Sequence, residues 1–213
     1  MNEHLVILVT LTTITSALPL MSGCTEQDKT ITPETLQTIL EKAAVLESVT
    51  YDIHTELLVN GEVHQTTTRI WQQLPYLKEE ENRTAGNITT TQQIIQRPDG
   101  LYVYDDVVQS YQLNPQAILP YHSTVDLVAD LLNNQTLTII GTEELNGKPT
   151  TVIQYSPLHM GNTTTRKLWV WNEKGVPLKA VSLTQNNEIT ETTTATYSNY
   201  TFEHIPESLF SVE

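Results

Sequence analysis

The sequence has one cysteine, Cys24, and few positive charges: 11 Lys and Arg residues stand against 25 Asp and Glu, a formal net charge of −14. A single cysteine excludes a disulfide within the chain. The shortage of Lys and Arg argues against nucleic-acid binding, which needs basic residues gathered on one face. It also disfavours electrostatic docking to anionic lipid, so any contact with a membrane must come by another route.

Motifs of catalysis are also missing. The sequence contains no Gly-x-Ser-x-Gly, no His-Glu-x-x-His and no phosphate-binding glycine loop, and its 8 glycines fall mostly in expected turns. Asp105 and Asp106 are interpreted as a turn, and not as a cation site or acid pair, because neighbouring strand residues point apart. His122, His159 and His204 stand alone near expected element ends. We predict no catalytic residue, no metal site and no cofactor, with an enzyme as the less favoured alternative.

An uncharged apolar stretch, residues 5–21, precedes the cysteine. It is diluted by Thr and shorter than the roughly 20 strongly apolar residues of a membrane-spanning helix, so it predicts a signal peptide. Ser22 and Gly23, directly before Cys24, resemble the end of a lipoprotein signal, in which the cysteine becomes the lipid-modified first residue.

We therefore expect residues 1–23 to be a leader, residues 24–32 a polar tether and residues 33–213 one domain. The domain would be exported and held at the outer face of the cytoplasmic membrane through lipidated Cys24. Two alternatives stay open: an ordinary signal peptide cut nearby, which leaves Cys24 as a free thiol, and a retained N-terminal anchor. The usual lipoprotein pattern has Leu where this chain has Met21, and the leader begins without Lys or Arg.

An exported chain is open to glycosylation at Asn-x-Ser/Thr sequons. The asparagines that meet this pattern are Asn82, Asn87, Asn134, Asn162 and Asn199. Chance explains any single sequon equally well, because the sequence is rich in Thr. Acidity, Thr content and sequons together resemble archaeal cell-surface proteins.

Two helices are expected. The first covers residues 33–48, where Thr32 can act as N-cap, Pro33 occupies the favoured first position and apolar residues recur at helical spacing. The second covers residues 123–133, with Ser123 as its N-cap. Each presents one apolar face, so both should pack on a sheet.

Between the helices the apolar period changes from 3.6 to 2. Strands 51–59 and 63–74 are joined by Asn60-Gly61, the strongest two-residue hairpin signal. A turn of this length sets the register and places Asp52 opposite Arg69 as a cross-strand ion pair.

The same register separates two histidines. It pairs His54 with Thr67 and Leu57 with His64, which puts the histidines on opposite faces, so they cannot share a metal ion. Tyr51, Ile53, Leu57 and Val59 share one face of this hairpin.

The remaining pattern predicts a meander of antiparallel strands with short links. The expected strands are residues 76–82, 87–97, 101–104, 107–113, 136–144, 150–156, 165–172, 176–185 and 188–202. In the hairpin across Asn146-Gly147, the register places Ile140 opposite Ile153.

Three stretches of this meander carry a likeness to a known family. Residues 99–112 contain Asp-Gly-Leu-Tyr-Val-Tyr-Asp followed by Gln-Ser-Tyr-Gln, residues 168–179 read Leu-Trp-Val-Trp-Asn-Glu-Lys-Gly-Val-Pro-Leu-Lys, and residues 202–210 end in Ile-Pro-Glu-Ser-Leu-Phe. In these stretches the chain resembles the LolA-like superfamily of lipoprotein carriers and lipoprotein-sorting proteins, which includes RseB-like sensors and lipid-binding lipoproteins.

The resemblance implies an α+β fold, mainly antiparallel β. It would be a curved sheet or incomplete β-barrel, with the N-terminal helix and the inserted helix covering the concave side. A curved sheet that its own side chains do not fill leaves an apolar cavity, and an acyl chain is a natural occupant. Candidate lining residues, for each of which plain core packing is the commoner role, are Leu57, Val59, Leu101, Val103, Ile140, Ile153, Leu168, Val170 and Leu178.

The sequence thus predicts an extracytoplasmic, lipid-anchored monomer that binds an acyl or isoprenoid chain or a lipidated partner. The alternative is a non-catalytic cell-surface interaction or envelope-sensing module with a filled core. A large apolar cavity on the concave side would favour the first function, and a filled concave side would favour the second.

Overall fold

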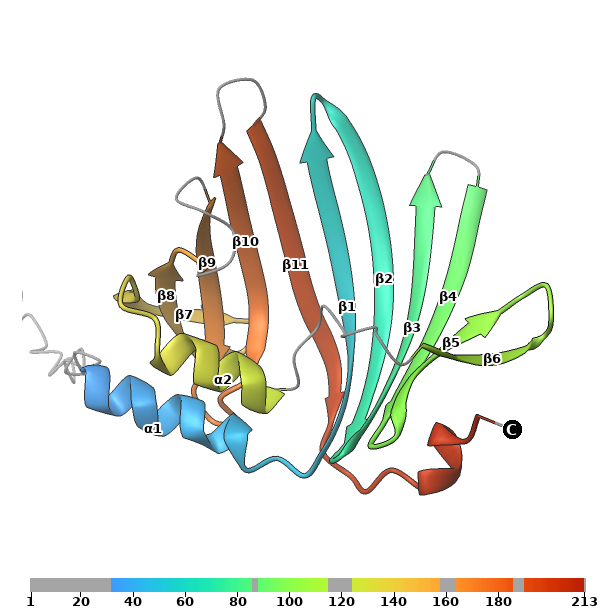
Figure 1. Ribbon diagram of the computed structural model, residues 1–213. Helices are drawn as coiled ribbons and strands as arrows, with labels where there is room; N and C mark the ends of the chain where they lie inside the picture. The colour runs from blue at the N-terminus through green and yellow to red at the C-terminus, as the bar shows by residue number, and fades with distance from the viewer. Residues whose placement is uncertain (1–31, 86–87, 115–123, 158–163, 186–189, 213) are drawn as a thin grey trace, which may run out of the picture.

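The computed structural model describes residues 32–85, 88–114, 124–157, 164–185 and 190–212. One antiparallel sheet of 11 strands dominates it, with helices packed on both of its faces (Figure 1). The elements are α1 (Pro33–Ala44), β1 (Ser48–Val59), β2 (Glu62–Gln73), β3 (Tyr76–Ala85), β4 (Ile88–Arg97), β5 (Gly100–Asp105), β6 (Ser110–Asn114), α2 (Thr124–Leu132), β7 (Thr138–Leu145), β8 (Lys148–Tyr155), β9 (Thr164–Trp171), β10 (Pro177–Gln185), β11 (Thr190–Thr201) and the 3₁₀ helix η1 (Glu207–Phe210).

The strand order is β6-β5-β4-β3-β2-β1-β11-β10-β9-β8-β7. The chain therefore starts at the centre of the sheet, runs outward to β6, and returns from the other edge until β11 pairs with β1. The sheet is strongly curved, and β6 and β7 form its two separate edges, so the barrel is incomplete (Figure 1). The predicted fold class is confirmed.

The first hairpin has the predicted register. Asn60 and Gly61 adopt φ values of 52° and 83°, as a two-residue turn of this type requires. Asp52 pairs with Arg69, and Arg69 Nε lies 3.6 Å from Asp52 Oδ1. His54 pairs with Thr67, whereas His64 pairs with Leu57, so the two histidines lie on opposite faces of the sheet.

The register predicted for the β7–β8 hairpin is wrong beyond its first pairs. Asn146-Gly147 forms the turn, but a bulge between Ile139 and Gly141 places Ile139 opposite Ile153 and turns Ile140 out, where it is 52% exposed. Because of the bulge, both residues of the pair that faces the helices, Ile139 and Ile153, are large and apolar.

The strand predicted from Val107 begins instead at Ser110. Asp105 Oδ1 accepts hydrogen bonds from the backbone N–H groups of Val107 (2.8 Å) and Val108 (3.2 Å), which closes a longer turn. Residues 106–109 therefore form the turn, and the ladder between β5 and β6 starts with the pair of Asp105 and Ser110.

Both predicted helices form, with changed bounds. Thr32 Oγ1 accepts from the backbone N–H of Thr35 at 3.3 Å and caps α1, which ends at Ala44 and so is shorter than expected. The predicted N-cap of α2, Ser123, lies outside the described residues.

The core has three parts. The largest lies between α1, α2 and strands β8 to β10, and we call the face of the sheet that these helices cover the concave face. A second cluster continues along that face beyond the helices, around Ile53, Ile70, Leu77 and Leu101. The third lies on the convex face, where Phe210 of η1 packs with Ile95 and stacks on Tyr76 at 5.5 Å.

Candidate functional site

The two helices form a lid on one end of the concave face, and a small apolar pocket opens between lid and sheet. Its lining comes from α1, α2, β9, β10 and the turn that joins these two strands: Leu40, Ala43, Leu127, Val128, Leu131, Leu168, Val170, Gly175 and Pro177. The cavity volume is about 10 Å³, room for about one water molecule. The pocket is too small for an acyl chain, so the described residues show no large concave cavity of the kind that would favour lipid binding over an interaction module.

α1 is held directly against the β9–β10 turn. Gly175 has a φ of +74°, and a Cβ on it would clash with the carbonyl oxygen of Ile39. Lys42 Nζ also donates to the carbonyl oxygen of Asn172 at 2.7 Å. One end of the lid is thus fixed to the sheet backbone, whereas α2 contributes apolar contacts.

The structure gathers only some of the predicted lining residues under the lid. Ile153, Leu168 and Val170 are almost fully buried in the core cluster between the lid and the sheet. Leu101 belongs to the second concave cluster, and Leu178 is buried at 4% exposure. Leu57, Val59 and Val103 are partly buried away from the lid, and Ile140 is exposed.

Beyond the lid, the concave face of β1 to β5 carries both apolar and polar side chains. The pairing of the strands defines rows across it, and one row runs Tyr51, Ile70, Glu79, Ile94, Val103. The next row contains Ile53, Thr68, Glu81 and Gln92. Two carboxylates of β3 therefore lie in neighbouring rows of the concave face.

Glu79 and Glu81 are buried, with 2% and 4% exposure. Arg83 donates through Nε to Glu81 Oε1, while Glu79 Oε2 has no hydrogen-bond partner among the described residues. Burial, followed by repulsion from Glu81, raises the pKa of Glu79 to about 7, although attraction to Arg83 lowers it. Burial also raises the pKa of Tyr51 well above its ordinary value, with smaller contributions from Tyr197 and Glu79.

The sequence interpretation overlooked this carboxylate pair, although a signal was present. Leu77 is a core residue of the same strand, and period-2 alternation carries the concave face from Leu77 to Glu79 and Glu81. A run of Lys and Glu residues is ordinarily interpreted as solvated surface, which hid the alternation.

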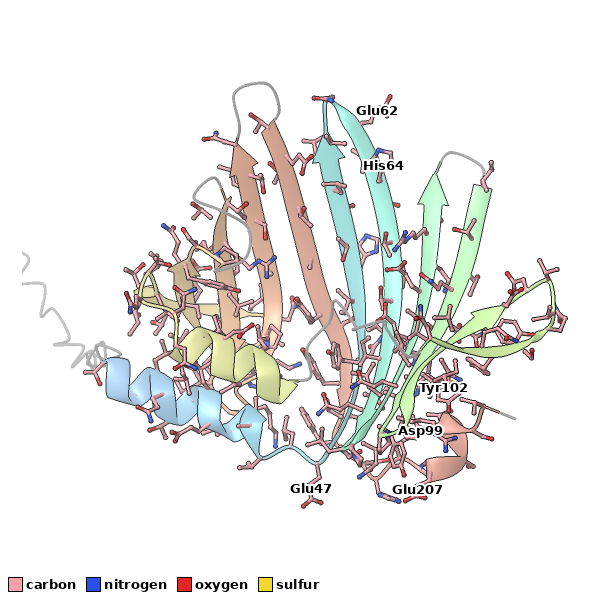
Figure 2. All side chains as sticks on the ribbon, viewed as in Figure 1. Glu47, Glu62, His64, Asp99, Tyr102 and Glu207 are labelled. Carbon is pink, nitrogen blue, oxygen red and sulfur yellow. The ribbon has the colours of Figure 1, made fainter. Side chains whose placement is uncertain are left out.

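At the end of the sheet farthest from the lid, β1 and β2 project beyond the core. Figure 2 shows Glu62 and His64 near the tip of β2, and their Oε2 and Nε2 atoms lie 3.9 Å apart. His54 lies on the other face, 3.7 Å from Glu56. Among the described residues, no three His, Cys, Asp or Glu side chains are grouped as a metal site would need.

The predicted modification sites are scattered. Cys24, Asn87 and Asn162 lie outside the described residues. Asn82 accepts from Thr91 Oγ1 at 2.7 Å, and exposed Asn199 donates to Asp52 Oδ2 at 2.7 Å.

Asn134 differs from the other described sequons because it is buried, at 9% exposure. Its Nδ2 donates to the carbonyl oxygen of Ser156 at 2.9 Å, and its Oδ1 accepts from the backbone N–H of Thr136 at 2.9 Å. A glycan on Nδ2 would have to displace the contact with Ser156.

In the part of the chain that the structure describes, no helix is long and apolar enough to cross a membrane.

A curved, open antiparallel sheet with two helices on its concave side is the LolA-like half-barrel fold. No protein family model and no curated protein matches the sequence. The structure is similar to that of an uncharacterized conserved protein from Thermus thermophilus, with a TM-score of 0.54 and 9% identity over 82% of this chain and 91% of that chain.

It is also similar to MucB in the complex of Pseudomonas aeruginosa MucA/MucB and to MucB alone. Both comparisons give a TM-score of 0.52 and 16% identity over 84% of this chain, and they cover 61% and 62% of the matched chains. The chain therefore spans about three fifths of the MucB chains that it matches. These likenesses establish the fold, and the organisms named do not support the archaeal source expected from composition.

Proposed function

We propose that this chain is a non-catalytic, extracytoplasmic binding protein that takes an acyl or isoprenoid chain, or a lipidated partner, between its two-helix lid and the sheet. The observation that carries the proposal is the apolar interface under the lid. Lid and sheet meet there through side chains such as Leu131 and Leu168, and a small pocket already opens between them.

A chain can enter this interface only if the lid moves, because the closed pocket is about 10 Å³. Moving α2 off the sheet exposes apolar surface, and an acyl chain that takes its place covers that surface again. Since hydrophobic stabilisation follows the apolar area removed from water, the exchange is close to balanced in free energy. The fixed contact of α1 at Gly175 would make α2 the moving part.

Attachment to the membrane is the second part of the proposal. A chain with a net charge of −14 has little electrostatic attraction to anionic lipid. Lipidation of Cys24 would hold it at the membrane surface, with residues 24–32 as the tether. The half-barrel would then work as a monomer at the outer face of the cytoplasmic membrane, where lipids and lipidated proteins are within reach.

Filling the pocket tests the lid function. The full chain with Cys24→Ser is titrated with a dansyl-labelled undecanoic acid, with and without Leu131→Trp, which places an indole in the pocket. The matched control is Leu183→Trp, at a 38% exposed position of β10. We expect the probe's fluorescence to rise with the parent chain and the control and to stay flat with Leu131→Trp. Equal binding by all three proteins would contradict entry under the lid.

The alternative function is a protein-interaction or envelope-sensing module. Two observations favour it: the volume under the lid is small, and the concave face beyond the lid carries two buried carboxylates, Glu79 and Glu81. MucB, whose fold is similar, is found in a complex with MucA. In this alternative the concave face of β1 to β5 would bind a polypeptide and the lid would stay closed.

Native mass spectrometry of the protein extracted from its own membrane separates the two functions. A bound mass equal to one lipid supports the lid function, and a bound polypeptide with no lipid supports the interaction module. Treatment with a lipase before the measurement identifies a lipidated partner, because the enzyme removes acyl groups and so lowers the partner's mass.

A further inference from the structure

Two acidic side chains and one basic side chain share the centre of the concave face. Glu79 and Glu81 lie in adjacent rows of β3, and Arg83 follows in the next row of the same strand. The Arg83 ion pair uses Glu81 Oε1, whereas Glu79 Oε2 is buried without a hydrogen-bond partner among the described residues. The site therefore has one carboxylate more than its own cation can satisfy.

Burial of a carboxylate without a partner is costly, and such a group in a folded protein calls for an explanation. The two side chains that flank Glu79 in its row, Ile70 and Ile94, are apolar and cannot supply a hydrogen bond. A group that arrives at the concave face from outside the described chain can supply it.

We propose that Glu79 and Glu81 form a recognition site for a cationic group, an ammonium or a guanidinium, on a ligand that lies across the concave face of β1 to β4. This site is separate from the pocket under the lid, which α1, α2 and β9 line. Arg83 is the resident cation of this site. Its side chain is 65% exposed and pairs with Glu81, whose side chain is 5% exposed, so Arg83 can move aside for an incoming cation. An incoming cation would bind Glu79 and share or replace the contact of Arg83 with Glu81.

A Lys or Arg side chain of a protein partner fits this site best, because the resident cation that already pairs with Glu81 is itself an arginine. The amine of a lipid headgroup carries the same charge. Both would bring the same chemistry to the same pair of carboxylates, and the probes below distinguish them.

Cation binding at this site should depend on pH because Glu79 is half-protonated near neutrality without a ligand, with a pKa of about 7. A bound cation favours the carboxylate, so binding should release a proton and strengthen by about tenfold from pH 6 to pH 8. No ionisable side chain of β2 or β4 lies directly beside Glu79 in its row. Tyr51 on β1 is the titratable group in the same row, and those that face Glu79 from other described rows are Glu81 and Arg83 on β3, Tyr197 on β11 and Asp105 on β5.

NMR of the side-chain carboxyl carbons provides the test, on the full chain with Cys24→Ser. The probes at millimolar concentration are N-acetyl-argininamide, N-acetyl-lysinamide, glycerophosphoethanolamine and, as the uncharged control, N-acetyl-citrullinamide. We expect the Glu79 and Glu81 signals to shift with a cationic probe and to stay in place with the citrulline compound. A response to the amino-acid probes supports a protein partner, whereas a response to glycerophosphoethanolamine alone overturns that source in favour of a lipid headgroup.

Glu79→Gln should abolish the shift of the Glu81 signal, and Arg83→Gln should strengthen it because the competing cation is gone. The matched control is Glu80→Gln, on the same strand but on the convex face. The proposal fails if no cationic probe shifts either signal at pH 8, if the citrulline compound acts equally, or if Glu79→Gln binds like the parent chain. Dansyl-undecanoic acid binding by Glu79→Gln should stay unchanged, which keeps this site distinct from the lid pocket.

Discussion

Gly175, in the turn between β9 and β10, lies in backbone contact with Ile39 of α1: a Cβ on Gly175 would clash with the Ile39 carbonyl oxygen and lie 2.9 Å from the Ala43 amide nitrogen. Both neighbours are backbone atoms of a helix, so no side chain can rotate away to make room. This contact sets how closely the lid can approach the sheet.

Gly175→Ala should therefore push α1 away from the turn. We expect a loss of roughly 2–4 kcal/mol in the free energy of unfolding, because strain at a positive φ adds to the clash. The control is Gly147→Ala, which has a similar φ of +73° and open space around its Cβ position. It should cost only about 1 kcal/mol. Urea unfolding measures the stability of both variants. Equal losses of stability would show that the contact of Gly175 with Ile39 does not hold α1 against the turn.

The buried carboxyl of Glu79 should make stability depend on pH. Its pKa is raised from 4.5 to about 7, so between these values the folded protein holds a proton that the unfolded chain releases. The stabilisation from this group is complete below pH 4.5 and is lost as pH rises through 7, by no more than about 3 kcal/mol.

Glu79→Gln replaces that carboxyl with a neutral group of the same shape. It should leave stability nearly unchanged at pH 5 and raise it at pH 8, where the wild type must bury a charge. Thermal unfolding from pH 4 to pH 9 measures this, with Glu80→Gln on the convex face as the control. A parallel pH profile for Glu79→Gln and wild type would show that folding does not raise the pKa of Glu79.

Asn134 should be structural. Removing its side chain in Asn134→Ala leaves the carbonyl of Ser156 and the backbone N–H of Thr136 without this partner, a loss of about 2 kcal/mol. Exposed Gln135 is the control position, where substitution by Ala should cost less than about 0.5 kcal/mol. Chemical denaturation compares the two variants. A glycan found on Asn134 in protein from the native source would overturn this structural role.

If Cys24 is lipidated, its substitution should move the protein from a membrane-like phase to an aqueous one. Wild type should partition into the detergent-rich phase of a Triton X-114 separation, and Cys24→Ser should move to the aqueous phase, because one or more acyl chains supply membrane affinity that the acidic domain lacks. Partition of both proteins into the aqueous phase would show that no lipid is attached. Retention of both in the detergent phase would point to an uncleaved leader.

Local signals in the sequence were sufficient for the first hairpin, and the resemblance to a known family implied the fold class. The Asn60-Gly61 turn admits one register, and that register predicted both the Asp52–Arg69 pair and the separation of His54 from His64. Turns of this kind act through bonds between residues close in sequence, so they can be read without knowledge of the rest of the chain.

Similar local logic failed where a partner far along the chain decided the outcome. The turn at Asn146-Gly147 predicted that Ile140 lies opposite Ile153. In the structure, the bulge beside Ile139 puts Ile139 in that place and turns Ile140 outward. The β8 strand is paired on its other side with β9, and the lid core selects which residues face inward. A register predicted from one turn takes account of neither the pairing with β9 nor the packing under the lid.

The sequence by itself thus determined the start of the first helix and the turns at Asn60-Gly61 and Asn146-Gly147, because these depend on neighbours within a few residues. Only the tertiary structure brought β1 beside β11, closed the lid to a small pocket and placed Glu79 between Ile70 and Ile94. Those relations depend on long-range pairing and on how much water remains around a group. A polar-looking stretch of β3 became a buried acidic site for that reason.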